Sequence, residues 1–402
     1  MKKLAKVLSL MLAGTMVLSM AACGGSNSSK QESGGAENNT SSDAVFKIGG
    51  IGPTTGGAAQ YGLGVKNAAE IAVDEINAAG GINGYKVEFK FEDDEHDPEK
   101  SVNAYNSLKD WGMQILMGTV TSGPSTAVSA EAVNDSIFML TPSASSVDVI
   151  KDKPNVFQIC FTDPNQGLAS AQYIGQNLKD ITKVAAIYDS SDVYSSGVYS
   201  TFKAEAANQP FEIVAEGAFT QDNKTDFSVQ LQQAKDAGAE LLFLPFYYQE
   251  ISLVLTQADD MDYKPIIFGV DGMDGILGVE NFNTSLAEGV YLLTPFVADA
   301  TDDATVKFVT AYKEKCSDEV PNQFAADAYD AMYTLKAAIE KADLTPEDDI
   351  SAICEGLVGA ITEITVTGLT SDETGMTWNA EGEVSKAPKA MIIKNGAYTS
   401  VE

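Results

Sequence analysis

Apolar residues along the chain alternate between two spacings, one typical of buried strands and one typical of helices. Val45–Gly52 is a short apolar run that ends in glycines, which predicts a buried strand leading into a loop. From Tyr61 to Ile76 apolar residues recur every three or four positions, which predicts a helix closed by Gly80-Gly81. Residues 87–92 then alternate between apolar and polar, as expected for a strand with one face in water.

The same strand–helix unit repeats, and a second series begins after Cys160. Further strands are expected at Gln114–Gly118, Ile137–Leu140, Val184–Tyr188, Glu212–Ala218, Leu241–Leu244, Ile266–Gly269 and Met391–Lys394. Further helices are expected from Pro98, from Gly123, at Asn165–Leu178, Gly197–Ala207, Asp226–Ala237 and Glu250–Met261, and again between Ala304 and Leu357. Repeated strand–helix units give parallel sheets covered on both faces.

Two such series predict an α/β fold of two doubly wound, Rossmann-like lobes joined by a hinge of several chain segments. We expect the N-terminal lobe to comprise residues 45–162 and 296–385. The C-terminal lobe is then expected to comprise residues 163–295 and 386–402. In doubly wound sheets ligands bind beyond the carboxyl ends of the strands.

The first 44 residues predict export. Lys2, Lys3 and Lys6 precede the apolar run Val7–Met20, which is too short for a stable spanning helix, and Ala21-Ala22-Cys23 follows. A cysteine directly after two alanines resembles a bacterial lipobox, so residues 1–22 are interpreted as a lipoprotein signal peptide and Cys23 as the lipidated N-terminus. The alternative is a plain signal peptide with an incidental cysteine. Residues 23–44 are rich in Gly, Ser and Asn and predict a flexible tether.

Charge and composition exclude several classes of partner. The chain has 57 Asp+Glu against 26 Lys+Arg, a net charge of −31, and all of the basic residues are lysine. Nucleic-acid binding needs a basic surface and is therefore not expected. A site for a carboxylate must work without a bidentate guanidinium. The single histidine, His96, leaves little room for metal sites or histidine-based catalysis, and no cofactor is expected.

Hydroxyl-rich loops follow two consecutive expected strands. The first is Thr119–Thr126, in which Ser122 is a good N-cap and Pro124 suits the first helical turn. The second is Thr141–Ser146. One such loop would be read as an ordinary helix cap, but two together predict an anion site made of hydroxyls and amides.

A carboxylate and several aromatic residues occupy comparable positions. Asp271 follows the strand Ile266–Gly269 and precedes Gly272, so it is either a turn residue or a partner for an ammonium group. The aromatic residues near strand ends and helix starts are Tyr61, Tyr194, Tyr247, Tyr248 and Phe324. They are either core residues or the walls of a pocket.

Seven segments together resemble the leucine/isoleucine/valine-binding proteins, the type I periplasmic receptors of ABC importers. They are IGGIGPTTGGAAQYG, AAGGINGYKVEFKFEDDEHDPEKS, TSGPSTA, LTPSASS, FYYQE, GVDG and FAADAYDAM. The similarity covers nearly all of residues 45–402, and its specificity lies in the order of the motifs. It implies the type I periplasmic binding protein fold.

The resemblance also implies a site. Ser122 and Ser145 correspond to the residues that hold the substrate carboxylate, while the carbonyl of Ser143 and the acid Asp271 correspond to the ammonium partners. The acid is often glutamate in this family, so aspartate has a shorter reach. The aromatic positions match Tyr61, Tyr194, Tyr247 or Tyr248, and Phe324. His96 and Thr121 fall where some relatives have a disulfide.

The function implied is capture of a small amino acid, branched-chain amino acids first, by hinge closure, followed by delivery to an ABC permease in the membrane. We expect a monomer outside the cytoplasm, held to the membrane only by lipid on Cys23. One alternative keeps the fold but binds another small acid or an amide, or acts as a sensor. Catalysis by the acidic cluster Asp93–Asp97 is not expected, because acids are usual before a helix start. A disulfide between Cys316 and Cys354 is left open, with Cys160 unpaired.

Overall fold

The computed structural model describes residues 44–401, so the expected signal peptide, Cys23 and nearly all of the tether lie outside the described residues. The described chain forms two sheets covered by helices. Between residues 44 and 401 no helix combines the length and the apolar character needed to cross a bilayer. The predicted α/β architecture of two doubly wound sheets is confirmed.

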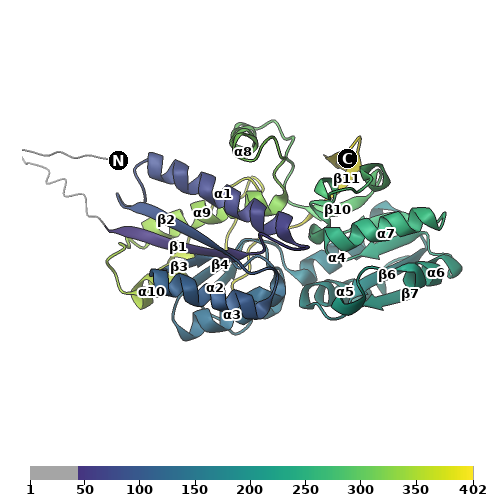
Figure 1. Cartoon of the computed structure of the whole chain (residues 1–402), viewed down its shortest axis with the longest axis horizontal. Helices are drawn as coiled ribbons and strands as arrows, with labels where there is room; N and C mark the ends of the chain where they lie inside the picture. The colour runs from purple at the N-terminus through teal and green to yellow at the C-terminus, as the bar shows by residue number, and fades with distance from the viewer. Residues whose placement is uncertain (1–43, 402) are drawn as a thin grey trace, which may run out of the picture. The chain divides into compact units, whose positions relative to one another are not determined.

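The first sheet is entirely parallel, with strand order β2-β1-β3-β4-β5. Its strands are β1 (Val45–Gly52), β2 (Lys86–Asp93), β3 (Ile115–Met117), β4 (Phe138–Thr141) and β5 (Val156–Gln158). The helices that cover it are α1 (Ala59–Ala78), α2 (Pro98–Trp111), α3 (Ser122–Asn134), α9 (Gln323–Lys341) and α10 (Ile350–Ile361). Helices α1 and α9 lie side by side on one face, and α2 and α3 cover the other (Figure 1). This sheet and its helices are the first lobe.

The second sheet has the order β12-β11-β10-β9-β8-β6-β7 and is parallel from β7 to β10. Its parallel strands are β6 (Lys183–Asp189), β7 (Glu212–Phe219), β8 (Leu241–Leu244), β9 (Ile266–Gly269) and β10 (Tyr291–Thr294). The antiparallel edge is made by β11 (Lys389–Lys394) and β12 (Ala397–Ser400).

Four helices cover the second sheet, and with it they are the second lobe. They are α4 (Asp163–Asn177), α5 (Val193–Ala206), α6 (Ser228–Asp236) and α7 (Tyr248–Asp260). Helices α4 and α5 pack on one face, and α6 and α7 on the other. A further helix, α8 (Asp303–Lys315), packs against α1. Short 3₁₀ turns follow several strands, at Val147–Val149, Gln221–Asn223, Asp271–Met273, Ile276–Gly278 and Thr284–Ala287.

Both lobes place their first strand between the second and the third, so each has a switch point where the loops on its two sides diverge. In the first lobe the switch point lies between β1 and β3, and in the second between β6 and β8. Ligands of doubly wound sheets bind in the crevice at this point. The fold therefore directs two sets of loops toward a single site.

The chain passes between the sheets three times, after β5, after β10 and before β11. At the last crossing, the buried ammonium of Lys386 forms an ion pair with Asp327 of α9. The crossings agree with a hinge of several segments, while the residue boundaries of the lobes stay predictions.

Candidate functional site

A small cavity of about 270 Å³ lies between the carboxyl ends of the two sheets. Its walls come from both lobes and consist of Tyr61, Val120, Thr121, Ser122, Ser143, Ser145, Tyr194, Tyr247, Asp271, Gly272 and Phe324. The structure thus brings together all of the expected ligand-binding residues except Tyr248.

The first-lobe wall consists of buried hydroxyl groups without a cation. Ser122 Oγ accepts a hydrogen bond from the Ser146 amide at 3.2 Å, and Ser143 Oγ donates to the Val120 carbonyl at 2.6 Å. Ser145 is 1% exposed, and its carbonyl accepts a hydrogen bond from the Asp163 amide at 2.9 Å. These serines lie in the loops that follow β3 and β4, as their positions in the sequence predict.

The start of α3 differs in one detail from the expectation. The N-cap is Thr121, not Ser122, and Ser122 lies within the first turn. Sequence alone cannot separate two adjacent hydroxyl residues that both suit a cap. The shift matters because the first amides of a helix have no partner within the helix, and Ser122 now contributes one of them to the wall.

His96 contacts two residues that line the cavity, Thr121 and Tyr247. His96 Nδ1 is hydrogen-bonded to Thr121 Oγ1 at 2.8 Å, and the His96 ring meets the Tyr247 ring edge-on with centroids 5.3 Å apart. Burial, together with the charge of Lys224, lowers the pKa of His96 to about 4. The imidazole is therefore neutral at neutral pH and adds no cation to the cavity.

Asp271 is the charged group of the second-lobe wall, and its carboxylate accepts hydrogen bonds from two side chains. Tyr194 Oη donates to Asp271 Oδ1 at 2.6 Å, and Gln166 Nε2 donates to Asp271 Oδ2 at 2.9 Å. The Gly272 amide in turn donates to Tyr194 Oη at 2.9 Å. Burial raises the pKa of Asp271 to about 7, although these hydrogen bonds favour the ionised form. A nearby cation would restore the ionised state.

Gln166 is a site residue that sequence reasoning missed. Besides its bond to the carboxylate, its Oε1 accepts a hydrogen bond from the Asp271 amide at 3.3 Å. It lies in α4, 105 residues before Asp271, so no local pattern relates the two. Asp163 and Ser170 are further buried polar residues of the same helix, so the sequence of α4 offered no signal that singled out Gln166.

Gly272 is a glycine for a steric reason. A Cβ atom at this position would lie 2.6 Å from Tyr194 Oη and 2.8 Å from the Phe246 carbonyl oxygen. Its carbonyl accepts a hydrogen bond from the hydroxyl group of Tyr61 in the first lobe. The glycine therefore allows Tyr194 and the backbone of Phe246 to pack closely against this turn of the second lobe.

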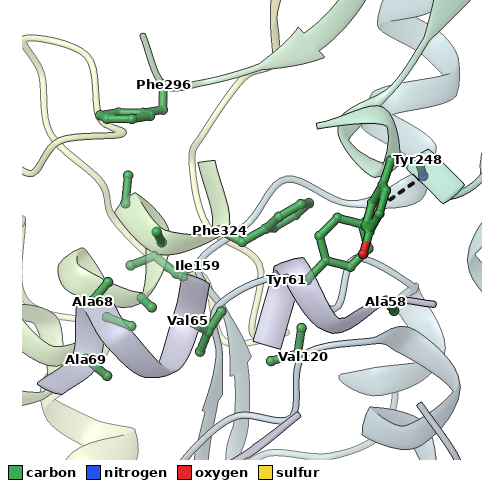
Figure 2. Close-up of a cluster of buried hydrophobic side chains, with 14 of the residues drawn as sticks. Ala58, Tyr61, Val65, Ala68, Ala69, Val120, Ile159, Tyr248, Phe296 and Phe324 are labelled. Atoms are coloured by element: carbon green, nitrogen blue, oxygen red, sulfur yellow. Dashed lines mark hydrogen bonds between the residues drawn. The ribbon is translucent and has the colours of Figure 1, made fainter. Parts of the chain in front are cut away.

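The aromatic residues form one contiguous cluster. Tyr194 and Tyr247 stack with centroids 5.2 Å apart. Tyr61 meets Phe324 at 4.7 Å and Tyr248 at 4.9 Å, both edge-on, and Figure 2 shows these three rings together. Tyr247 lines the cavity, whereas Tyr248 packs against Tyr61 and is not among the lining residues. The aromatic side chains thus belong to the hydrophobic core, and all of them except Tyr248 also line the cavity.

The acidic cluster Asp93–Asp97 has local structural partners. Asp93 accepts hydrogen bonds from the Thr54 amide and the Thr55 hydroxyl, Asp94 from Ser101, and Asp97 caps α2. Within residues 44–401 no group of three or more His, Cys, Asp or Glu side chains is arranged to hold a metal ion. These acids are accounted for by turns and caps.

The three cysteines of the described chain are free. Cys160 and Cys354 are buried, and Cys316 is partly exposed at the end of α8. The disulfide left open between Cys316 and Cys354 is therefore not formed in this structure.

Comparison with known proteins identifies the family. Residues 45–377 match the family model described as periplasmic binding protein, and the chain belongs to this family. The Leu/Ile/Val-binding protein homolog 3 of Brucella melitensis is 34% identical over 340 residues, which are 83% of this chain and 88% of that protein. The resemblance that the sequence motifs indicated is confirmed.

Two further relatives extend the comparison. The leucine-, isoleucine-, valine-, threonine- and alanine-binding protein of Pseudomonas aeruginosa is 27% identical over 333 residues, 82% of this chain and 87% of that protein. The crystal structure of the branched-chain amino acid transporter substrate binding protein LivJ from Streptococcus pneumoniae, in complex with isoleucine, has a TM-score of 0.79 and 26% identity. The match covers 89% of this chain and 99% of the LivJ chain.

Proposed function

We propose that this protein is the extracytoplasmic substrate-binding component of an ABC importer, and that it captures a small amino acid by closing its two lobes. The family is one of binding proteins, and the chain is not an enzyme. The relatives are named for binding leucine, isoleucine and valine, which supports branched-chain amino acids as the first ligands to test.

The observation that carries the proposal is the division of charge across the cavity. One wall offers hydroxyls and helix-end amides without a cation, and the opposite wall offers the carboxylate of Asp271. A zwitterion satisfies both walls, with its carboxylate near Ser122 and Ser145 and its ammonium between the Ser143 carbonyl and Asp271. A simple carboxylic acid would leave the buried Asp271 without a cation, which is unfavourable.

The aromatic walls then receive the side chain. Tyr61, Tyr194, Tyr247 and Phe324 offer apolar ring surface around a cavity of about 270 Å³. Their rings are held by mutual contacts, so little side-chain entropy remains to be lost on binding. Tyr248 is proposed to act through its contact with Tyr61.

We further propose that residues 1–22 are removed and that lipid on Cys23 anchors the protein, with residues 23–44 as the tether. The protein would then act as a monomer with lobes bounded near residues 162, 295 and 385, and present bound amino acid to a membrane permease. The proposed cleavage and lipidation are supported by the basic residues Lys2, Lys3 and Lys6, the apolar run Val7–Met20 and the following Ala21-Ala22-Cys23. Expression with a radiolabelled fatty acid should label the wild type and not Cys23→Ser; equal labelling would contradict lipidation at this residue.

A thermal-shift screen of residues 44–402 tests the proposed ligand class. A ligand present well above its dissociation constant raises the melting temperature, by the equivalent of about 3 kcal/mol at 100 times that constant. Leucine, isoleucine, valine, threonine and alanine are compared with benzoate and with an aliphatic amide. A shift with amino acids and none with the other two supports the proposal, and the reverse pattern contradicts it.

A further inference from the structure

His96 is the only histidine of the chain, and the backbone around it fixes where its ring lies. It belongs to the short turn between β2 and α2, where Glu95 and His96 have φ angles of 51° and 63°. The His96 amide donates to Asp94 Oδ1 at 2.9 Å, and the buried Asp94 carboxylate also accepts from Ser101 Oγ at 2.6 Å. A left-handed backbone is uncommon outside glycine and persists where surrounding contacts maintain it. The turn therefore holds the imidazole beside the cavity.

The imidazole ring contacts both lobes. In the first lobe, His96 Nδ1 is hydrogen-bonded to Thr121, the N-cap residue of α3 and part of the cavity wall. In the second lobe, the ring meets that of Tyr247, the residue before α7, at an interplanar angle of 83°. Tyr247 in turn stacks on Tyr194, which donates to Asp271. Opening the hinge would leave the bond to Thr121 intact and would separate His96 from Tyr247.

The imidazole is neutral while the lobes are together. Three charged groups act on it, Lys224 in the segment after β7, Asp189 at the end of β6 and Asp97 at the start of α2, and the phenol of Tyr247 is neutral because burial raises its pKa. Burial and Lys224 lower the pKa of His96 to about 4, although the two acids act in the opposite direction. An imidazole that opening returns to water has a pKa of about 6.5. Below this pH, closing the lobes must therefore remove a proton from His96.

We propose that His96 is a positioning residue that holds the Tyr247 ring in place as a wall of the cavity when the two lobes come together. This inference rests on the proposed function for the closing of the lobes around a ligand. Aromatic rings that meet edge-on with centroids 5.3 Å apart stabilise each other beyond the area that they bury. Because the contact exists only in the closed form, it should slow the release of ligand and leave the rate of association unchanged.

His96→Asn isolates the ring contact. Asparagine tolerates a positive φ angle and has a polar δ atom that can keep the bond to Thr121, but it has no ring to meet Tyr247. With the ligand found in the thermal-shift screen, the dissociation constant at about pH 7.5 should rise about 2- to 10-fold, through faster release in stopped-flow measurements. Asp262→Asn is the matched control, since it places asparagine at another positive φ angle, in an exposed turn, and should not change the release rate. An unchanged release rate in His96→Asn would overturn the proposal.

The pH profile separates this role from a merely structural one. A histidine whose pKa is lower in the closed than in the open form favours closing above about pH 6.5, and this contribution is lost as the pH falls toward about 4. The affinity of wild type relative to His96→Asn should therefore fall about tenfold between about pH 7.5 and about pH 5.5. Titration of Asp271 affects both proteins and cancels in this ratio. A ratio that stays constant over this range would overturn the proposal.

A ligand-free measurement keeps this test distinct from that of the proposed function. Substitutions of two residues in contact have effects that are not additive. His96→Asn should therefore lower the urea midpoint of wild type more than that of Tyr247→Leu, in which the partner ring is already absent. Equal decreases in the two backgrounds would contradict the contact between His96 and Tyr247 and overturn the proposal. Unequal decreases in a protein that binds none of the screened amino acids would support the contact and contradict the proposed function instead.

Discussion

Asp271 meets two opposing requirements, since binding an ammonium needs its charge and the empty cavity disfavours it. Its pKa of about 7 lies above the unfolded value of about 3.8 because of burial. A raised carboxyl pKa stabilises the fold below the unfolded value and loses this contribution as the pH rises through 7. The loss amounts to about 4 kcal/mol by the free energy per pKa unit.

Asp271→Asn should therefore increase stability and reduce binding. Without ligand, the variant should melt above wild type at about pH 8, and the gap should narrow as the pH falls toward about 4. Its affinity for the amino acid should fall about 100-fold or more, because the ammonium loses its buried partner. Calorimetric titration and thermal unfolding across this pH range measure both. The matched control is Asp303→Asn, which replaces an exposed acid in α8 and should change neither the stability nor the ligand affinity. An unchanged affinity in Asp271→Asn would show that Asp271 is not part of the binding site.

Among the site residues, those that directly follow a predicted strand were identified from the sequence. Those that long-range packing brings to the site were not. Ser122, Ser145 and Asp271 follow strands that the apolar runs predict. Gln166 reaches the site through its contact with Asp271, which lies 105 residues away, whereas only the family resemblance, and no local pattern, related His96 to Thr121. Such pairings depend on the tertiary arrangement, which a single sequence does not record.

Among the elements, the long periodic helices and the buried strands were predicted, whereas β5, β10 and β12 were not. Length alone does not explain this, because β3, β8 and β9 also have three or four residues and were predicted from their apolar runs. β12 is half exposed, so it lacks an apolar signal. Short strands are specified by their neighbours in the sheet more than by their own sequence.

The pairing of α4 with α5 positions both Asp163 and Gln166, and it depends on a glycine. A Cβ atom at Gly167 would lie 2.5 Å from the Val198 carbonyl oxygen and 2.7 Å from the Phe202 amide nitrogen. Both are backbone atoms, so the helices would have to separate to accommodate it. Overpacking of this kind costs about 1–3 kcal/mol.

Gly167→Ala should therefore destabilise the protein by about 2 kcal/mol even though alanine is the better helix former. The matched control is Gly359→Ala in α10, where a Cβ atom meets nothing within 4 Å. That change should stabilise the protein by about 1 kcal/mol at most. Urea denaturation measures both midpoints. Gly167→Ala should also weaken ligand binding because α4 moves. Equal stabilisation by the two changes would show that the helices are not closely packed at Gly167.

In the whole molecule, several direct hydrogen bonds join the lobes around the cavity, and we refer to three of them as the closing contacts. The Tyr61 hydroxyl donates to the Gly272 carbonyl, the Gln60 amide donates to Tyr248 Oη at 3.2 Å, and the Gln323 amide donates to Asp274 Oδ2 at 2.8 Å. Since each joins an element of one lobe to an element of the other, opening the hinge must break all three. They favour the closed form independently of any ligand atom.

Tyr248→Phe isolates one closing contact, because Tyr248 does not line the cavity and keeps its ring packing against Tyr61. A single hydrogen bond contributes about 1 kcal/mol, so the dissociation constant should rise about 3- to 10-fold, mainly through faster ligand release. Tyr263→Phe is the control, since the Tyr263 hydroxyl donates to the Ala239 carbonyl at 2.9 Å inside the second lobe. Both variants should lose similar stability, but only Tyr248→Phe should release ligand faster in stopped-flow measurements. Equal release rates in the two variants would mean that the Gln60–Tyr248 bond does not hold the lobes closed, and that closure depends on contacts made through the ligand.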